Sequence, residues 1–324
     1  MIWATSNFFV LTTFIAFFIV GVIYPSLFYL QLGVKQAATS YIDNWWNCKI
    51  SYARVIDKPK ILVVSGSNSL FSISAYQMEK ELNIPTVNFG VHAGLGLKYL
   101  LDRTKNELKY GDIVLLPLEY QLYKEVETFG GEHNDYICAY DAEYFNNMPS
   151  IQKVKFVYTS SFNSIRHGIE HRLGKKRNFT GYSDMTMNKN GDIIGNIYVK
   201  RKLEQVNSFK IDITGKDSYL NDAVAEYLKD FVNFCNMNNI KLIVTYPATY
   251  MDNGKFSDGD IVVLEKIEKF WKDQDGVIIL NSYQDNLYAK DDFYDGNYHM
   301  NDVGRAKRTK QIIKDLSEYL WYIC

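Results

Sequence analysis

The chain opens with a long run of apolar and uncharged residues. From position 8 to position 32 it reads FFVLTTFIAFFIVGVIYPSLFYLQL, with no Asp, Glu, Lys or Arg. A helix needs about 20 apolar residues to cross the hydrocarbon core of a membrane. The apolar stretch of a cleaved signal peptide is shorter, about 7–15 residues. The pattern therefore predicts a retained membrane anchor over residues 1–32, with a modest kink at Pro25.

Short apolar runs alternate with helical stripes after residue 58. The runs are rich in β-branched residues and end at Gly, Pro or Ser, which is typical of buried parallel strands. They lie at residues 60–64, 86–89, 113–116, 242–245 and 277–280. Stripes with a period of 3.6 residues predict helices over about 70–82, 219–237, 261–271 and 302–322. The alternation predicts a flavodoxin-like three-layer α/β/α fold with about five parallel strands over 59–324, preceded by a stalk at 33–58.

The alternation lapses between residues 121 and 216. This stretch is polar and rich in Asn and Tyr, with one helical pattern at 151–172 and a turn sequence, KNGD, inside a predicted hairpin at 188–198. Large insertions of this kind lie at the edge where α/β folds build their sites. We therefore expect an inserted cap subdomain.

Composition narrows the function classes. Lys and Arg number 36 against 37 Asp and Glu, so no excess of positive charge favours nucleic acid. The four cysteines are scattered and form no CxxC pair, which argues against a zinc ribbon or a dense disulfide framework. Cys235 is predicted to be a buried apolar residue, and a disulfide among Cys48, Cys138 and Cys324 stays open.

Two short segments at opposite ends of the chain combine into one candidate site. Ser67 follows the first predicted strand beside Gly66, and His299 lies just before the final helix with Asp295 four residues earlier. A serine nucleophile needs a neighbouring base, and that base needs an acceptor that orients it. Because both loops belong to the same edge of the predicted sheet, we expect Ser67, His299 and Asp295 to meet as a catalytic triad.

These segments carry a family resemblance. VVSGSNSLFSI resembles the first conserved block of the SGNH/GDSL hydrolase and acyltransferase superfamily, and DGNYHMNDVG resembles the last. VNFGVHAG is similar to the second block, which supplies an oxyanion-hole glycine. The resemblance implies that Ser67 is the nucleophile and that its oxyanion and substrate site is formed by Gly66, Asn68, Gly90, His92 and Gly94.

With the N-terminal anchor, the chain looks like the membrane-tethered SGNH-like proteins of envelope polysaccharide O-acetylation and teichoic-acid D-alanylation. That resemblance implies acyl transfer or ester hydrolysis on a cell-envelope glycan, a multi-span membrane O-acyltransferase as partner, and no cofactor. It also implies a large domain outside the cell membrane. The positive-inside rule favours the opposite orientation, because residues 1–7 carry no Lys or Arg while Lys35 and Lys49 follow the span.

Two departures from the family pattern keep a second hypothesis open. The third block normally supplies an oxyanion-hole asparagine, but the corresponding residues here read LPLEY at 116–120. Asp295 and His299 are four apart rather than the usual three, so Asp292 or a backbone carbonyl is an alternative orienting group. Losing one oxyanion donor costs about 10²–10³ in rate, and a catalytically inactive accessory subunit is therefore the alternative.

A third hypothesis comes from residues 167–171, which read HGIEH. His167 and His171 would share a helical face with Glu170 as general base, as in zinc proteases of the H-x-x-E-H type. The basic residues around this segment, Arg166 and Arg172 among them, disfavour a dication. We expect no metal site here.

Overall fold

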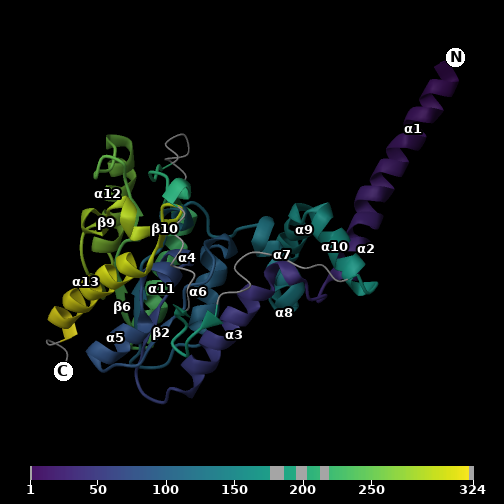
Figure 1. Ribbon diagram of the computed structural model, residues 1–324. Helices are drawn as coiled ribbons and strands as arrows, with labels where there is room; N and C mark the ends of the chain where they lie inside the picture. Colours follow the sequence, from purple (N-terminus) through teal and green to yellow (C-terminus); the bar gives the residue numbers. More distant parts are fainter. Residues whose placement is uncertain (1, 176–185, 195–202, 212–218, 321–324) are drawn as a thin grey trace. The chain divides into compact units, whose positions relative to one another are not determined.

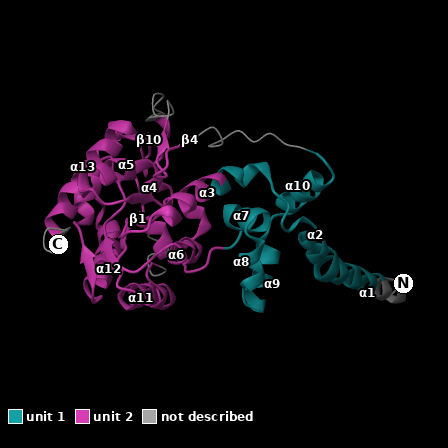
Figure 2. Cartoon of the chain, turned by 90° about the horizontal axis from the view of Figure 1, so that it is seen from below, with its two compact units in different colours: residues 1–43, 129–183 teal, residues 44–128, 184–324 magenta. Residues whose placement is uncertain are grey.

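The computed structural model describes residues 2–175, 186–194, 203–211 and 219–320 (Figure 1). The chain divides into two compact units, which are described separately. The first consists of residues 1–43 and 129–183, and the second of residues 44–128 and 184–324 (Figure 2). The second unit contains the sheet and every residue of the predicted triad.

All five predicted strands are confirmed, and all run parallel. The described strands are β1 (Ile61–Val63), β2 (Thr86–Asn88), β3 (Ile113–Leu116), β6 (Lys241–Val244) and β8 (Val277–Ile279). Their order across the sheet is β2-β1-β3-β6-β8. β1 is therefore flanked by β2 and β3, and the loops that follow these three strands emerge together at one edge.

Helices cover both sides of this sheet (Figure 2). α5 (Ala75–Leu82) and α13 (Asp302–Leu320) lie on one side, and α6 (Leu97–Lys105) and α11 (Asp222–Met237) lie on the other. Alternate strand residues, such as Ile61 and Val63, pack in one core with Met78 of α5 and Leu316 of α13. Burial of successive strand residues on both sheet faces explains why these strands read as continuous apolar runs. α12 (Asp258–Lys272) completes the helices predicted around the sheet.

The predicted helix at 70–82 is in fact two helices. α4 (Ser67–Ser72) ends where Ile73 adopts an extended conformation, and α5 begins after Ser74, whose side chain accepts a hydrogen bond from the Gln77 N–H. A serine N-cap of this kind stabilises a new helix start. The break shortens α4 to less than two turns, so Ser67 lies at its first position.

The segment at 33–58 differs from the expected stalk. Most of it is η2 (Ala37–Thr39) and α3 (Ser40–Val55), and the second half of α3 is packed into the sheet unit. Trp46 and Lys49 are fully buried. The Lys49 ammonium donates to the carbonyl oxygens of Asn88, at 2.6 Å, and Gly191, at 2.8 Å.

Gly191 belongs to the tight turn of the predicted hairpin. Its strands are β4 (Thr186–Met187) and β5 (Ile193–Ile194), and residues 195–198 of the prediction lie outside the described residues. Asp192 in the turn accepts from the N–H groups of Ala75 and Tyr76, both at 2.8 Å, and so caps α5. This hairpin is therefore part of the sheet unit.

The first unit is helical. It contains α1 (Ile2–Phe18), a π-helical turn η1 (Ile19–Ile23), α2 (Tyr24–Gln31), α7 (Gly131–Tyr140), α8 (Ala142–Asn147), α9 (Ser150–Thr159) and α10 (Phe162–Arg172). The predicted helix at 151–172 is divided between α9 and α10, because Ser160 is extended and Ser161 caps α10. The N-terminal helix is long and apolar enough, over Phe8–Gln31, to span a membrane.

This apolar run has two different environments. Side chains from Phe8 to Ile23 are largely exposed, whereas Phe28 of α2 is completely buried. Phe28 packs against Phe145 of α8 and Phe156 of α9, with ring centroids 5.3 and 6.0 Å apart. The predicted anchor at 1–32 therefore ends in a helix that forms the core of the helical unit.

The predicted insertion is likewise divided. Only residues 129–183 of the 121–216 stretch join the helical unit, and the remainder of its described residues belongs to the sheet unit. Cys48, Cys138 and Cys235 are free thiols, and Cys324 lies outside the described residues.

Candidate active site

Ser67 lies at the carboxyl edge of the sheet. It follows β1 and Gly66, and it is the first residue of α4. Every other residue from Ile61 to Ile73 is buried, and Ser67 alone in that stretch is partly exposed. The local fold therefore presents one hydroxyl to solvent from an otherwise buried turn.

The structure brings the three predicted catalytic residues together. His299 Nε2 lies 2.9 Å from Ser67 Oγ, and His299 Nδ1 lies 2.6 Å from Asp295 Oδ1. A carboxylate can only accept, so Nδ1 carries the hydrogen and Nε2 accepts from the serine hydroxyl. Both side chains are partly buried, with exposed fractions of 20% for His299 and 12% for Asp295. This is the hydrogen-bond chain that an activated serine requires.

Strand pairing explains how a spacing of four residues still orients the imidazole. β10 (Phe293–Asp295) and β11 (His299–Met300) are antiparallel, and Asp295 lies directly opposite His299. The connecting turn contains Gly296 at φ +63°, a conformation that favours glycine. The alternative orienting residue, Asp292, is bound instead to the Lys307 ammonium at 2.6 Å.

Three contacts from α4 hold the His299 segment in place. The Phe71 ring stacks on the imidazole, with centroids 4.3 Å apart and planes inclined by 19°. The Asn68 amide and the Ser72 hydroxyl both donate to the carbonyl oxygen of Tyr298, at 3.1 and 3.2 Å. α4 and the β10–β11 pair consequently lie side by side (Figures 1 and 2). Asn68 is fully buried, so its side chain holds the Tyr298 carbonyl and does not line the substrate site.

Two glycines allow the turn to be this compact. A Cβ on Gly66 would lie 2.6 Å from the backbone of Ala93, and one on Gly90 would lie 2.1 Å from Ser69 Oγ. Neither separation is sterically possible without movement of the surrounding structure. Gly66 and Gly90 therefore fit a packing requirement at the predicted site.

Sequence reasoning missed Glu119, which lies after β3 where the family asparagine was expected. Its carboxylate is fully buried and accepts from the N–H groups of Gly66, at 2.9 Å, and Asn68, at 2.7 Å, and from the Ser65 hydroxyl. The two N–H groups lie on either side of Ser67. The signal in the sequence was a lone acidic residue directly after a buried strand.

The predicted oxyanion donors are engaged in other bonds. The Gly94 N–H donates to His92 Nδ1 at 3.0 Å, and the Gly90 N–H donates to Asn88 Oδ1 at 3.0 Å. The N–H groups of Gly66 and Asn68 donate to Glu119, as described above. Ser67 is the first residue of α4, so its N–H has no carbonyl of a preceding helical turn to donate to. This N–H is therefore the backbone donor of this turn best placed to face a substrate.

A buried cation from α13 interacts electrostatically with the Glu119 carboxylate. Arg308 is fully buried, and burial lowers the pKa of its guanidinium while the nearby Glu119 acts in the opposite direction. It donates to the Tyr246 carbonyl at 2.6 Å and to Asn286 Oδ1 at 3.1 Å. Burial also raises the pKa of Tyr298 well above its usual value, so that hydroxyl stays neutral.

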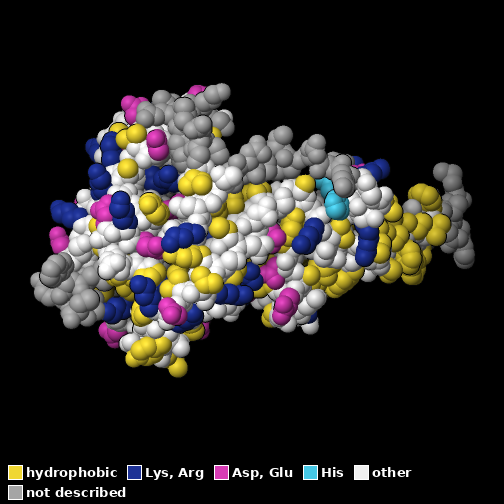
Figure 3. Space-filling model, turned by 60° about the horizontal axis from the view of Figure 1, so that its bottom comes forward, with side chains coloured by type: hydrophobic (Ala, Val, Ile, Leu, Met, Phe, Trp, Pro, Cys, Tyr) yellow, Lys and Arg dark blue, Asp and Glu magenta, His cyan; other side chains and the backbone are white. Residues whose placement is uncertain are grey.

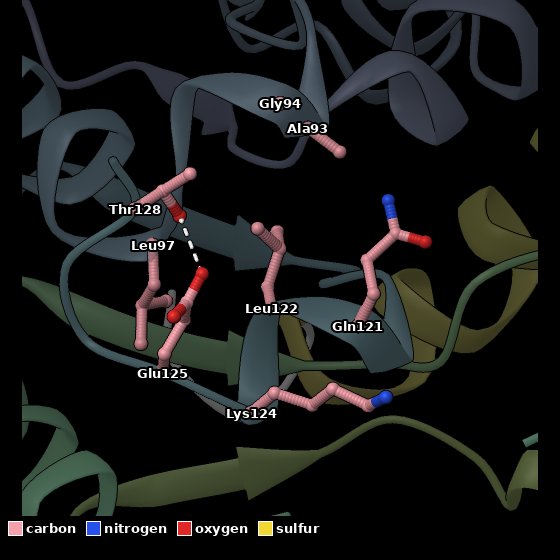
Figure 4. A pocket seen from close by; sticks show the side chains of 8 residues that line it. All are labelled: Ala93, Gly94, Leu97, Gln121, Leu122, Lys124, Glu125 and Thr128. Atoms are coloured by element: carbon pink, nitrogen blue, oxygen red, sulfur yellow. Dashed lines mark hydrogen bonds between the residues drawn. The ribbon is translucent and has the colours of Figure 1, made fainter. Parts of the chain in front are cut away.

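A cavity of about 440 Å³ opens beside the serine turn (Figure 4). Ala93, which contacts Gly66, and Gly94 form one wall, and η4 (Tyr120–Tyr123) and the residues after it form the other. The lining is mixed, with apolar and polar side chains from Ala93, Gly94, Leu97, Gln121, Leu122, Lys124, Glu125 and Thr128. Its size is in the range of small-molecule sites.

The H-x-x-E-H segment forms part of α10 in the helical unit. Arg166 contacts both Glu170, at 3.4 Å, and His167 Nε2, at 3.2 Å. A guanidinium against these groups opposes a divalent cation. Within the described residues, no group of three His, Cys, Asp or Glu side chains is arranged to hold a metal ion.

Comparison with known proteins gives no relatives: no family model, no curated protein and no solved structure matches this chain.

Proposed function

We propose that this protein is a membrane-tethered, SGNH-like serine acyltransferase or esterase that acts on a cell-envelope polysaccharide. The observation that carries the proposal is the hydrogen-bond chain Asp295–His299–Ser67, with heavy-atom distances of 2.6 and 2.9 Å. Ser67 and His299 are 232 positions apart in sequence and come together in this arrangement. Ser67 is the one partly exposed residue of an otherwise buried turn.

In this mechanism His299 first acts as a general base. Nε2 takes the proton of Ser67 as Oγ attacks the carbonyl carbon of an acyl ester. The tetrahedral intermediate then collapses, His299 returns the proton to the departing alcohol, and the acyl group remains on Ser67. A sugar hydroxyl, or water in the esterase reaction, gives its proton to His299 and attacks the carbonyl of the acyl-serine. The acyl group leaves on the acceptor, and His299 returns the proton to Ser67 Oγ. Asp295 keeps the imidazole in the required tautomer throughout.

The substrate class follows from the resemblance and is compatible with the cavity. The cavity adjoins the serine turn through Ala93, and its lining includes Lys124, Glu125, Gln121 and Thr128. A lining of mixed hydrogen-bonding and apolar side chains suits a hydroxyl-rich sugar with a small acyl group. The chemistry needs no metal or nucleotide.

The fold class supports the same location for the site. Numbered along the chain, the five sheet strands have the order 2-1-3-4-5 of flavodoxin-like folds, whose ligands bind at the edge between the first and third strands. Ser67 follows the first of these strands and Glu119 the third. A capping role for residues 129–183 stays a prediction.

We further propose that the N-terminal helix anchors the protein in the cell membrane, with the sheet unit outside. The extracytoplasmic orientation and a multi-span O-acyltransferase partner rest on the family resemblance. The orientation is tested with Met237→Cys, which places a cysteine at the exposed end of α11. Intact cells are treated with a membrane-impermeant, cysteine-reactive reagent, and we expect this cysteine to be labelled. Protection of that cysteine until the cells are broken would place the unit in the cytoplasm.

Covalent labelling by a fluorophosphonate, together with hydrolysis of an acetyl ester, tests the activity. We expect the intact protein to be labelled at Ser67, and we expect Ser67→Ala and His299→Ala to abolish both reactions. The matched controls are Ser150→Ala and His171→Ala, which alter an exposed serine and an exposed histidine of the helical unit. Full hydrolysis by Ser67→Ala would refute the proposal.

A specific observation favours a second candidate, an accessory subunit without catalysis. Glu119 takes up two backbone donors beside the serine, and the Gly94 N–H is bound to His92, which leaves a sparse oxyanion hole. In that case, envelope acylation in cells that lack the native protein would be restored equally by the native chain and by Ser67→Ala. Under the first proposal Ser67→Ala restores none.

A further inference from the structure

The π-helical turn in the N-terminal helix creates a carbonyl that needs an outside donor. In a π turn the Val20 carbonyl would pair with the N–H of residue 25, but that residue is Pro25 and has none. The Tyr158 hydroxyl of α9 donates to Val20 O at 2.9 Å. Its ring also stacks on Tyr24, with centroids 5.8 Å apart and planes 8° apart.

These contacts show that the apolar run joins the helical unit at Val20 and Tyr24. The Tyr24 hydroxyl donates to the carbonyl of Ser160, and beyond it α2 is the buried core helix described above. The helix from Ile2 to Ile23 is about 33 Å long at 1.5 Å per residue, close to the roughly 30 Å of a hydrocarbon core. α9 therefore meets the helix at the end of the segment that can cross a membrane.

α9 exposes apolar side chains on the face next to this junction. Ile151, Val154 and Tyr158 follow each other at intervals of three and four residues and so share one side of the helix. Their exposed fractions are 77%, 52% and 45%. We call these three residues the α9 face. Phe162, at the start of α10, is also 60% exposed.

The charge on α9 matches a lipid surface. Its ten residues include Lys153 and Lys155 and no acidic residue. Figure 3 shows hydrophobic side chains along the N-terminal helix and dark-blue Lys and Arg side chains beside its inner end. Apolar faces flanked by lysines bind the boundary between headgroups and acyl chains, and tyrosines are enriched there.

We infer that the α9 face is a second membrane contact, which lies in the headgroup layer where the N-terminal helix leaves the bilayer. The inference rests on the proposed membrane anchor and is independent of the proposed chemistry at Ser67. With α2 in its core, the helical unit joins the span without a flexible linker, so insertion of the span brings the α9 face to the lipid. Its occupant is a phospholipid surface with anionic headgroups.

Fluorescence quenching in liposomes tests the inference on the full chain. In a background of Cys48→Ser and Cys324→Ser, which keeps the buried Cys138 and Cys235, one accessible cysteine at a time is introduced as Phe14→Cys, Val154→Cys or Met237→Cys and labelled with an environment-sensitive fluorophore. The protein is reconstituted in phosphatidylcholine and phosphatidylglycerol at about 3:1, with or without nitroxide-labelled lipid or aqueous iodide. Phe14 reports on the span, and Met237, which is 86% exposed on α11, is the matched control.

We expect lipid nitroxide to quench the labels at positions 14 and 154 at least about threefold more than the label at position 237. We expect iodide in the water to quench the label at position 237 most. A label at Val154 that behaves like that at Met237 would overturn the inference while leaving the anchor intact. Shielding of Val154 from both quenchers would also overturn it, in favour of a protein partner. If the Phe14 label also escapes lipid quenching, the anchor itself fails. The same pattern at Ile151→Cys guards against a local effect of one substitution.

Discussion

The buried carboxylate of Glu119 offers the sharpest test of how the serine turn is held. Replacing it in Glu119→Gln keeps the shape but turns one acceptor oxygen into a donor. The amide then faces an N–H group of either Gly66 or Asn68, each of which lies within 2.9 Å of the native carboxylate. One charge-assisted hydrogen bond is lost and one buried N–H is left without an acceptor.

The expected size of the effect follows from that count. A hydrogen bond to a charged group contributes about 1.5–3 kcal/mol, and an unsatisfied buried donor costs about 1–3 kcal/mol. We therefore expect Glu119→Gln to lower the free energy of unfolding of the sheet unit by about 2.5–6 kcal/mol. A displacement of Ser67 on the order of 1 Å would in addition slow acylation about 10²-fold.

The assay compares denaturant unfolding with the rate constant of fluorophosphonate labelling, measured on the folded fraction. The matched control is Glu226→Gln, an exposed glutamate on α11, which should leave both quantities unchanged. Glu119→Asp, whose side chain is one methylene shorter, should show the same direction. A Glu119→Gln protein with native stability and native labelling would refute the reasoning, and lost stability with a native labelling rate would reduce Glu119 to a structural role.

Three further outcomes follow from the geometry. Asp295→Asn should slow labelling about 10²–10⁴-fold, because the amide no longer holds His299 in the required tautomer, while Asp291→Asn at the neighbouring exposed position should not. Burial lowers the pKa of Lys49 to about 7. The unfolded chain then binds the extra proton above that pH, so the free energy of unfolding should rise by about 2 kcal/mol between pH 7 and pH 9, a slope that Lys49→Met should remove in denaturant titrations. Gly66→Ala would place a methyl group 2.6 Å from neighbouring backbone and should abolish labelling while circular dichroism still reports helices and sheet.

The sequence allowed the sheet to be predicted almost completely. Strands buried on both faces produce continuous apolar runs, and that signal is local, so β1 to β8 of the central sheet were found within a residue or two. Helix breaks were missed at Ile73 and Ser160 because each depends on one or two residues inside an otherwise helical pattern. A single serine cap outweighs that pattern only in the folded context.

The apolar N-terminal run shows a different limit. Hydropathy is the same for a side chain that faces lipid and for one that faces a protein core, so residues 24–31 could not be separated from the span. Only the packing of Phe28 on Phe145 and Phe156 distinguishes them. The buried helix α3 was missed for the opposite reason, since its mixed composition, with Lys49 in the interior, reads as a linker.

For the site, residue chemistry and the family resemblance predicted three residues that the structure brings within hydrogen-bond distance of one another. They did not predict which backbone groups remain available, because hydrogen-bond partners such as Glu119 and His92 are set by tertiary contacts. The unusual spacing of Asp295 and His299 is reconciled by the bulged β10–β11 pairing, which a comparison of motif lengths cannot reveal.

The tether from Asn68 and Ser72 to the Tyr298 carbonyl has a consequence for biosynthesis. A nascent chain that has passed Ser67 lacks both His299 and the Tyr298 carbonyl that these side chains hold, until synthesis has proceeded more than 200 residues further. Under the proposed chemistry, Ser67 becomes reactive only once the His299 segment has been made and has folded onto α4. A truncated translation product that lacks His299 would then carry an inert serine.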